Sequence, residues 1–449
     1  MTDAGQLHDK PLRVAIAGLG TVGTGVIRLL RENAALIEAR AGVPIAITAV
    51  SARDRSRDRG VDISHIAWED DMTAMAARDD VDVVVELVGG SDGPALVLAR
   101  QALGRGKSFV TANKAMVAMH GMELAEAAEA GNAALKFEAA VAGGIPVVKG
   151  LREGAAANRI ERIYGILNGT CNYILSAMES TGADFAETLQ EAQALGYAEA
   201  DPAFDIDGVD AAHKLAILAA IGFGSRIDFS AVACTGIAAV RAADIAQADV
   251  LGYVIRLIGM ADMLDGEPGA VGEAKLLQRV RPCLVHKRHP LAHVTGPTNA
   301  VVAEGNFSGR LLFQGAGAGD GPTASAVVAD LIDLARGDTY SPFSVPTRAM
   351  EAVPAADPGG RMGRTYLRFT VTDRPGVLAE IAAAMRDAGV SIESLNQPAL
   401  SENAGGEALV ALVTHEGEER SVTRALELLE GSDSLTGPPL VMPILKDRG

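Results

Sequence analysis

The glycine-rich loop near the N-terminus limits the possible folds of this chain more than any other feature, and it comprises Gly18, Leu19, Gly20, Thr21, Val22 and Gly23. It follows the apolar run 12–17 (LRVAIA), which predicts a buried strand, and precedes a predicted helix that reaches about Leu30. In this GxGxxG pattern the first glycine permits a tight turn, the second lets a pyrophosphate approach, and the third lets helix and strand pack. The loop therefore predicts a dinucleotide at the helix N-terminus; the alternative is a turn that is merely tight.

Strand-like and helix-like stretches alternate through the first 137 residues. Apolar, β-branched runs predict strands at 45–51, 81–87 and 107–112, and helical patterns occupy about 94–103 and 121–130. Strands that alternate with helices form parallel sheets covered on both faces. Residues 1–137 are therefore predicted to form a Rossmann-type nucleotide-binding domain of the α/β class, and residues 311–343 are expected to pack back on it.

The end of the second predicted strand indicates which dinucleotide binds. An acidic residue at this place suits the ribose hydroxyl of NAD, whereas an arginine suits the 2′-phosphate of NADP. Here Arg53 comes first and further arginines follow at Arg55 and Arg57, which are equally consistent with a solvated basic loop. A guanidinium fork matches phosphate geometry. The sequence favours NADP(H) with Arg53 as the contact, and Asp54 is the residue that could let NAD(H) bind as well.

The remaining chain predicts two further domains joined by a linker. Residues 138–310 mix strand-like segments with amphipathic helices, which predicts an α+β domain. Residues 344–364 are rich in Pro, Gly and Ala without clear periodicity and are interpreted as a linker. Residues 365–449 follow the order of a compact βαββαβ module, which predicts a ferredoxin-like domain.

Composition excludes several classes of function. The formal net charge of −17 argues against non-specific binding to nucleic acid or to anionic membranes. The three cysteines are widely spaced and match neither a disulfide framework nor a metal-binding pattern, which favours the cytoplasm. The N-terminus lacks the apolar stretch of a signal peptide, and no uncharged apolar run reaches the ~18 residues of a membrane span.

The stretch 207–218 (DGVDAAHKLAIL) combines an acid and a base with an apolar helix. Asp210 and Lys214 are four residues apart and so project from one helix face, and the residues around them have the composition of a helix packed on several sides. Such a pair can be a structural ion pair or one wall of an active site. His213 lies on a different face, which favours a packed or surface histidine over a catalytic one.

Several segments resemble one family, homoserine dehydrogenase, in family order across nearly all of residues 12–340. They are GLGTVG, VVVELVGG (83–90), VTANKA (110–115), FEAAVAGGIPV (137–147), GILNGTCNYIL (165–175), LGYAEADP (195–202), DGVDAAHKL (207–215) and QGAGAGDGPTASAVV (314–328). DRPGVLAEIA (373–382), with the strand that follows, resembles an ACT domain, a small amino-acid-binding regulatory module. No aspartate kinase portion precedes these segments, so the chain resembles the monofunctional form. Cys171 stands where the family more often has Thr.

The resemblance implies the NAD(P)H-linked interconversion of L-aspartate 4-semialdehyde and L-homoserine. The family places its proton donor and acceptor at Lys214 and a substrate contact at Asp210. It places Lys114 beside the nicotinamide and the substrate, where it would bind cofactor and support catalysis electrostatically. A lysine can carry this proton if burial lowers its pKa towards neutrality. We therefore expect Lys214 and Lys114 to be catalytic.

The resemblance assigns the remaining binding residues as well. Glu199 matches the family's other amine-binding acid, and Gly196 in the same turn is expected to contact substrate. Gly315 and Gly317 are expected to contact the cofactor. The Asn168-Gly169-Thr170 turn is expected to start a helix with Thr170 as its N-cap, even where it lines the site.

A cation site is a further implication of the family. A carboxylate and backbone carbonyls in a glycine-rich loop form a hard-oxygen site, although the residues alone favour a plain tight turn. The resemblance implies a monovalent cation, sodium, held by Glu138 and the carbonyls of Val141, Gly143 and Ile145. Its role would be structural.

Two other functions were weighed against this one. An acylating semialdehyde dehydrogenase would need a nucleophilic cysteine, for which Cys171 is the candidate. A non-catalytic sensor of nucleotide and amino acid would use the same modules, but the presence of both Lys114 and Lys214 weighs against it. For the enzyme we expect a homodimer or homotetramer formed through residues 138–310, and L-threonine as effector of the ACT domain.

Overall fold

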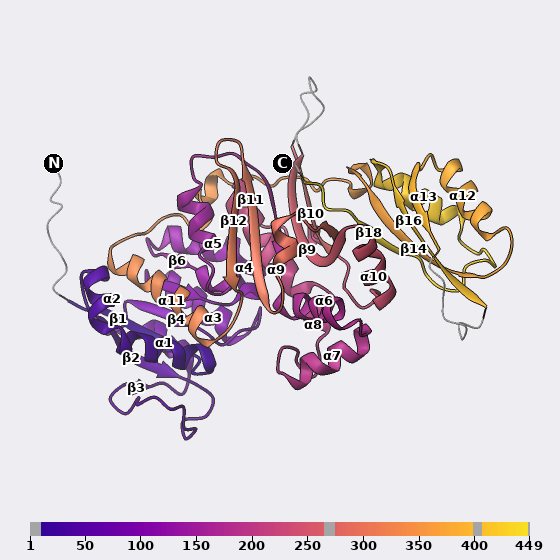
Figure 1. Cartoon of the computed structure of the whole chain (residues 1–449). Coiled ribbons are helices and arrows are strands. Elements are labelled where there is room, and N and C mark those ends of the chain that lie inside the picture. The colour runs from indigo at the N-terminus through magenta and orange to yellow at the C-terminus, as the bar shows by residue number, and fades with distance from the viewer. Residues whose placement is uncertain (1–9, 265–273, 398–405, 448–449) are drawn as a thin grey trace.

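The computed structural model of the chain describes residues 10–264, 274–397 and 406–447. Three bodies follow one another along the molecule (Figure 1), with the N-terminal domain at one end, a mixed sheet in the middle and the C-terminal domain at the other end. Within the described residues no helix is both long and apolar enough to cross a membrane.

The N-terminal sheet is parallel throughout, and its strand order is β3-β2-β1-β4-β5-β6. This is the order of dinucleotide-binding domains, and it confirms the predicted Rossmann-type fold. The strands are β1 (Leu12–Ala17), β2 (Ile45–Ser51), β3 (Ala67–Trp68), β4 (Val83–Glu86), β5 (Ser108–Thr111) and β6 (Leu135–Lys136). The helices are α1 (Thr21–Glu32), α2 (Ala34–Ala41), α3 (Pro94–Gly104) and α4 (Lys114–Ala130). The crevice between β1 and β4, where the strand order reverses, is the expected ligand site.

Helix α4 begins seven residues earlier than the helical pattern at 121–130 predicts. The Asn113 side chain accepts a hydrogen bond from the Met116 N–H (3.1 Å) and caps the helix directly after β5. Lys114 is therefore the first residue of α4 and lies at the carboxyl edge of the sheet.

The predicted return segment 311–343 divides between two places. Its first residues belong to β12 (Gly309–Ala316), which pairs with β11 (Thr298–Gly305) in the middle sheet. Helix α11 (Asp320–Ala335) packs on α1, where Val327 and Leu331 share a buried cluster with Val26 and Leu30. The chain thus crosses back to the first domain at the turn between β12 and α11.

The middle sheet has the order β12-β11-β7-β9-β10-β8 and is antiparallel apart from the β8–β10 pair. Its other strands are β7 (Ile160–Ile166), β8 (Ala233–Cys234), β9 (Tyr253–Leu264) and β10 (Lys275–His286). The helices of this domain are α5 (Val147–Lys149), α6 (Gly169–Thr181), α7 (Phe185–Ala194), α8 (Ala203–Ile206), α9 (Val209–Phe223) and α10 (Ala242–Val250). Strands and helices together confirm the predicted α+β class.

Helix α9 is buried along nearly its whole length, as its composition predicts. It contacts β7, β9 and β10 of the middle sheet and α4 of the Rossmann domain. It therefore lies between the two domains, and a side chain on it can reach both.

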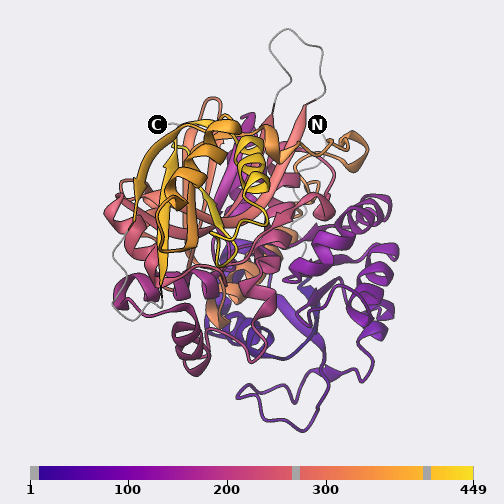
Figure 2. The same ribbon diagram turned by 90° about the vertical axis from the view of Figure 1, so that its right-hand side faces the viewer.

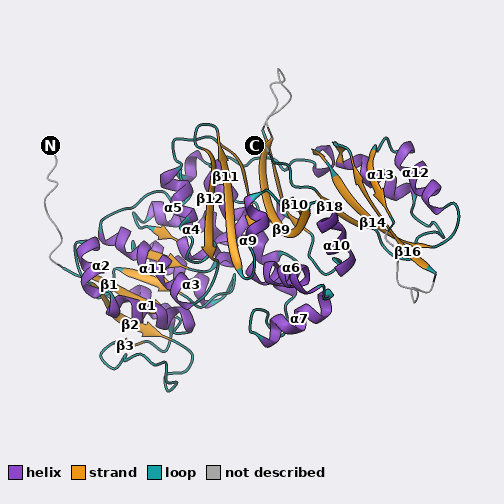
Figure 3. Cartoon of the chain, in the orientation of Figure 1, coloured by secondary structure: helices purple, strands orange, loops and turns teal. Residues whose placement is uncertain are grey.

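The C-terminal domain has the four-stranded order β15-β16-β14-β18, all antiparallel, which confirms the predicted ferredoxin-like fold. Figure 3 shows α12 (Val377–Asp387) and α13 (Glu419–Leu428) together beside this sheet. The strands are β14 (Thr365–Thr372), β15 (Ile392–Asn396), β16 (Glu407–Thr414) and β18 (Leu440–Pro443).

The segment 344–364, interpreted as a linker, lies along the middle domain. Backbone hydrogen bonds join Arg226 to Glu351 (2.9 Å) and Leu276 to Pro354 (2.9 Å). At its end, β13 (Met362–Gly363) pairs with β17 (Gly417–Glu418). The C-terminal domain lies against the middle sheet (Figure 2), and the pair of Asp244 on α10 with Arg368 on β14 (2.9 Å) is one of its anchors.

Candidate active site

The glycine-rich loop has the geometry that its pattern predicts. Gly18 has φ +100°, and a Cβ on it would lie 2.6 Å from the Leu87 carbonyl oxygen. A Cβ on Gly23 would lie 2.0 Å from the Gly18 carbonyl oxygen, so only glycine lets α1 approach β1 this closely. A Cβ on Gly20 would meet nothing within 4 Å, so the space in front of this turn is open for a pyrophosphate.

Buried polar side chains hold the turns that follow β4 and β5. Both oxygens of the fully buried Glu86 are used: Oε1 accepts from the N–H groups of Val88 (2.7 Å) and Gly89 (2.9 Å), and Oε2 from the Thr111 hydroxyl (2.6 Å). The Asn113 amide donates to the Gly90 carbonyl (2.6 Å). Since parallel strands end at the same edge of a sheet, these turns, the glycine-rich loop and Lys114 lie at one edge, where such domains bind their ligands.

The Asp210 carboxylate lies between two lysines. Its Oδ2 is 2.7 Å from Nζ of Lys214, one turn along α9, and its Oδ1 is 2.9 Å from Nζ of Lys114 on α4. The side chains of Asp210 and Lys214 are 5% and 10% exposed, whereas that of Lys114 is 34% exposed. Two catalytic candidates and one substrate-binding candidate thus meet at the junction of the two domains.

Further polar groups orient this pair. The Lys214 ammonium also donates to the Leu167 carbonyl (2.8 Å), which accepts a second hydrogen bond from the Asn299 amide (3.0 Å). The Asn168 amide donates to Asp210 (2.9 Å) and to Asp205 (2.7 Å). These hydrogen bonds hold the side chains of Asp210 and Lys214 in one geometry.

Asn168, not Thr170, is the N-cap of α6, which corrects the expectation for this turn. The Asn168 Oδ1 accepts from the Cys171 N–H (2.7 Å), three residues further on, which is the hydrogen bond that an N-cap side chain makes. An Asn just before a helix start signals the cap, but the contact of Asn168 with Asp210, 42 residues away in the chain, was not predicted from the sequence.

Burial and charge act in opposite directions on the two ionisable groups. Burial lowers the pKa of Lys214, and the carboxylate of Asp210 opposes this without cancelling it. Burial raises the pKa of Asp210, but the ammoniums of Lys214 and Lys114 lower it by more, so its net pKa is below the usual value. Asp210 therefore stays ionised while the proton of Lys214 is easier to remove than that of an exposed lysine.

The predicted substrate residues Glu199 and Gly196 lie on the turn after α7. Gly196 has φ +76°, and the Glu199 side chain is exposed while its carbonyl accepts from Gln193 (3.0 Å). Thr170 links this turn to the site, since its hydroxyl contacts the Tyr197 carbonyl (2.7 Å) and Asp205 (3.2 Å). Thr170 thus connects the turn to Asp205, which accepts from the same Asn168 amide that donates to Asp210.

His213 lies packed between two aromatic rings. Its ring centroid is 5.5 Å from that of Phe204 and 4.4 Å from that of Phe229, and burial lowers its pKa. A neutral histidine in an aromatic stack fills space, which agrees with the interpretation that favoured packing over catalysis.

Arg53 is exposed just beyond the end of β2. The neighbouring Asp54 accepts from the N–H (2.8 Å) and the hydroxyl (2.7 Å) of Ser56. Arg59 donates to the Leu19 carbonyl in the glycine-rich loop (3.3 Å) and lies 5.6 Å from the centre of the Trp68 ring. Sequence reasoning missed Arg59, which closes the arginine-rich run that begins at Arg53.

The expected cation ligands lie in one buried turn. Burial, and after it the charge of Asp330, raises the pKa of Glu138 to about 7, while its carboxylate accepts from the N–H groups of Val148 (3.0 Å) and Lys149 (2.9 Å). Within the described residues the carbonyls of Val141 and Gly143 accept no hydrogen bond, whereas that of Ile145 accepts from Val147 (2.7 Å).

The Glu138 carboxylate and these carbonyl oxygens suit a hard monovalent cation whose ligands are mostly backbone oxygens. Among the described side chains, no group of three or more His, Cys, Asp or Glu could hold a metal. The turn also contacts the expected cofactor glycines: a Cβ on Gly143 would lie 2.5 Å from the Gly317 carbonyl, and one on Gly315 would lie 3.2 Å from Ile145. A Cβ on Gly317 would meet the Asn299 side chain at 2.2 Å, so this crossing tolerates only glycine there.

Cys171 is unsuited to nucleophilic catalysis. It is buried, its Sγ lies 3.1 Å from the Asp205 carbonyl, and burial raises its pKa, with Asp205 and Asp210 acting in the same direction. A thiolate is the nucleophilic form, so this environment opposes the acylating alternative.

A dinucleotide crevice that adjoins a buried carboxylate between two lysines defines a pyridine-nucleotide-dependent oxidoreductase. Comparison with known families makes this specific. The family model "Homoserine dehydrogenase, NAD binding domain" matches residues 18–138, "Homoserine dehydrogenase" matches 146–332, and "ACT domain" matches 365–431. The chain belongs to the homoserine dehydrogenase family.

Individual members of the family match most or nearly all of this chain. The homoserine dehydrogenase of Mycobacterium tuberculosis is 42% identical over 431 residues, 96% of each chain. The crystal structure of a homoserine dehydrogenase from Thiobacillus denitrificans has a TM-score of 0.89 at 40% identity and covers 97% of this chain and 98% of that one. A hyperthermophilic archaeal homoserine dehydrogenase in complex with NADPH has a TM-score of 0.60 at 26% identity, with 72% of this chain and 97% of that one covered. These relatives favour the enzyme over both alternative functions.

Proposed function

We propose that this chain catalyses the NADPH-linked reduction of L-aspartate 4-semialdehyde to L-homoserine, a reversible step towards threonine, methionine and isoleucine, with Lys214 as the proton carrier. The observation that carries the proposal is the buried Lys214–Asp210 pair (2.7 Å) at the edge of the dinucleotide crevice. Bound NADPH supplies the hydride for the aldehyde carbon. Side chains of this protein bind the substrate and transfer the proton.

Lys214 donates a proton to the alkoxide that develops as the aldehyde is reduced, and takes it back in the reverse direction. The lowered pKa of Lys214, caused by burial, supports this role. Asp210 holds the Lys214 ammonium in place. The substrate's own ammonium would contact Asp210 beside Lys114, together with Glu199 from the turn that follows α7. Lys114 places positive charge beside the same carboxylate (2.9 Å), where it stabilises developing negative charge.

We assign NADP as the preferred dinucleotide. Arg53 is exposed just beyond β2 and able to pair with a 2′-phosphate, while one oxygen of Asp54 is engaged by Ser56. Gly20 leaves space for the pyrophosphate, and Gly315 and Gly317 are proposed as further cofactor contacts. The NADPH bound to the archaeal relative supports the assignment.

We also propose a structural sodium ion held by Glu138 and the carbonyls of Val141, Gly143 and Ile145. The unused carbonyls of Val141 and Gly143 support it, and so does the buried carboxylate, whose ionised form a cation would stabilise. The ion would brace the turn against the chain crossing at Gly317.

The ACT domain supports regulation by an amino acid, and we propose L-threonine. A cavity of about 150 Å³ adjoins the Asp373–Gly376 turn and is a candidate effector site. We propose a homodimer or homotetramer in the cytoplasm, where the three free cysteines would stay reduced.

The reaction itself is tested by steady-state rates on L-homoserine. We expect turnover with NADP that exceeds turnover with NAD, and a lower rate when L-threonine is added. Absence of turnover with either dinucleotide would contradict the proposed reaction, whereas unchanged turnover in threonine would contradict only the effector.

Lys214→Ala should lower kcat by about 10²-fold or more, because general acid–base catalysis contributes on this scale. NADPH affinity, measured by fluorescence titration, should stay within about twofold, and the exposed Lys287→Ala should change neither quantity. In the wild type, reductive kcat should fall as pH rises through the lowered pKa of Lys214, since the ammonium is the donor. Near-normal kcat in Lys214→Ala would reject the role.

Arg53→Ala should lower kcat/KM for NADPH by about 10- to 100-fold, the scale of one lost charged hydrogen bond. The same variant should leave kcat/KM for NADH within about twofold, because NADH lacks the 2′-phosphate. Arg105→Ala, at the exposed end of α3, serves as the matched control. Equal losses with both dinucleotides would show that Arg53 does not recognise the phosphate.

Sodium should raise the thermal unfolding midpoint relative to choline at the same ionic strength, because a ligand that binds only the folded state stabilises it. Glu138→Gln should remove this difference and the exposed Glu187→Gln should keep it. A wild-type midpoint that is the same in sodium and choline would argue against the site.

A further inference from the structure

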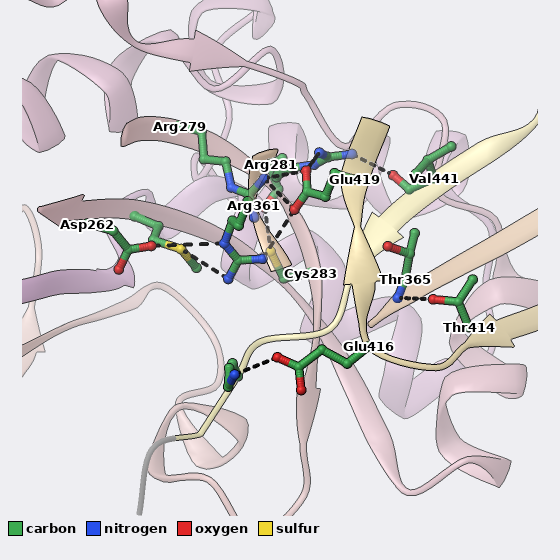
Figure 4. A network of polar contacts seen from close by, with 12 residues as sticks. Asp262, Arg279, Arg281, Cys283, Arg361, Thr365, Thr414, Glu416, Glu419 and Val441 are labelled. Carbon is green, nitrogen blue, oxygen red and sulfur yellow. Dashed lines mark hydrogen bonds and ion pairs between the residues drawn. The ribbon is translucent and has the colours of Figure 1, made fainter. Parts of the chain in front are cut away.

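A cluster of buried arginines lies where the ACT domain meets the middle sheet (Figure 4). Arg279 and Arg281 project from β10, Arg361 comes from the end of the linker, and Glu419 is the first residue of α13. This cluster is far along the chain from the Asp210 site, and neither the dehydrogenase reaction nor the DRPG turn uses it.

Three arginines surround the carboxylate of Glu419. Nη1 of Arg279 lies 2.9 Å and 2.8 Å from its two oxygens, Nη1 of Arg361 lies 3.2 Å away, and Nη1 of Arg281 is 3.8 Å away. Arg281 is therefore the arginine of the three without a close carboxylate; its Nη2 donates to the Val441 carbonyl (3.0 Å).

The positive charge of the cluster exceeds its negative charge. Its second carboxylate, Asp262, lies 2.9 Å from Nε of Arg162 and 4.0 Å from Nε of Arg361. Four guanidiniums thus face two carboxylates, and the nearby Glu416 is already paired with Lys446 (2.6 Å). Arginine cannot lose its proton in a protein, so a surplus of two charges stays in a poorly solvated place.

Some of these guanidinium N–H groups have no partner among the described residues. Nε and Nη2 of Arg279 and Nε of Arg281 are buried and form no hydrogen bond there. A buried donor without an acceptor costs about 1–3 kcal/mol, and more where it is charged. The cluster therefore has both the charge and the donors for an additional anion.

A cavity of about 230 Å³ adjoins the cluster at Arg281 and Glu419. Its remaining lining is Thr365, Val422, Thr423, Leu426, Val441 and Pro443, so it combines an end formed by Arg281 and Glu419 with an apolar wall and two hydroxyls. The volume suits a molecule of a few heavy atoms. It lies beside α13 and β18 and is distinct from the cavity at the Asp373–Gly376 turn next to α12.

We propose that this interdomain cavity binds a small carboxylate with a short aliphatic chain, its carboxylate paired with Arg281. The charge surplus calls for an anion, and the planar guanidinium suits the two oxygens of a carboxylate. The four apolar residues of the wall favour a carbon chain over inorganic phosphate. Because Arg281 and Glu419 come from different domains, the ligand binds at the contact between the ACT domain and the middle sheet.

Titration calorimetry of the full chain with sodium butyrate, at constant ionic strength in chloride, tests the proposal. We expect saturable binding of butyrate and none of butyramide, which has the same shape without the charge. Arg281→Gln should weaken butyrate at least about tenfold, the scale of one charged hydrogen bond. The exposed Arg288→Gln should bind butyrate like the wild type.

Leu426→Trp, which would fill the cavity without removing a charge, should weaken butyrate as well, and it keeps the test valid if Arg281→Gln fails to fold. Far-UV circular dichroism and dehydrogenase activity report folding of both variants. Equal butyrate affinity in wild type and Arg281→Gln would overturn the proposal. Binding of inorganic phosphate in place of butyrate, or of neither anion, would overturn it too.

Discussion

The site depends on the carboxylate of Asp210, which is shared by lysines from two domains. Lys214 comes from α9 of the middle domain and Lys114 from the start of α4 in the Rossmann domain, and both lie within 2.9 Å of it. Removing one partner of a buried ion pair leaves an uncompensated charge at a cost of about 3–5 kcal/mol. The same contact therefore joins the domains and fixes the position of Lys214, the proposed proton carrier.

Exposure distinguishes the two lysines chemically. Lys214 is nearly enclosed and donates to Asp210 and to the Leu167 carbonyl, so burial lowers its pKa while the geometry stays fixed. Lys114 is about one third exposed and lies 5.8 Å from the centre of the Phe204 ring. These surroundings agree with the proposed roles, proton transfer for the enclosed Lys214 and electrostatic support for the more accessible Lys114.

The sequence predicts what depends on short spacing and misses what depends on distant contacts. The three glycine roles and the Asp210–Lys214 pair follow from local patterns, and both appear in the structure. Lys114 contacts Asp210 from another domain, and the Asn168 amide contacts Asp210 from the start of another helix. Both contacts join residues that are distant in the chain, so local sequence patterns cannot predict them. Helix α4 begins at Lys114 because Asn113 caps it. The apolar residues of the stretch KAMVAMHG have only weak helical periodicity, so the sequence did not predict this start. The cluster of Arg279, Arg281 and Arg361 was not predicted, because Glu419, the carboxylate that they share, is distant from them in the chain.

Strand β10 connects the ACT domain to the candidate active site. It carries Arg279 and Arg281, which contact Glu419 of the ACT domain, and between them Val280, which packs beside the first turn of α9. A Cβ on Gly208, the residue just before α9, would lie 3.0 Å from the Val280 side chain, so the start of the helix packs closely against the strand. Asp210 follows two residues later. Because packed interiors resist small displacements, the pose of α13 on β10 and the pose of Asp210 on α9 are constrained by the same strand.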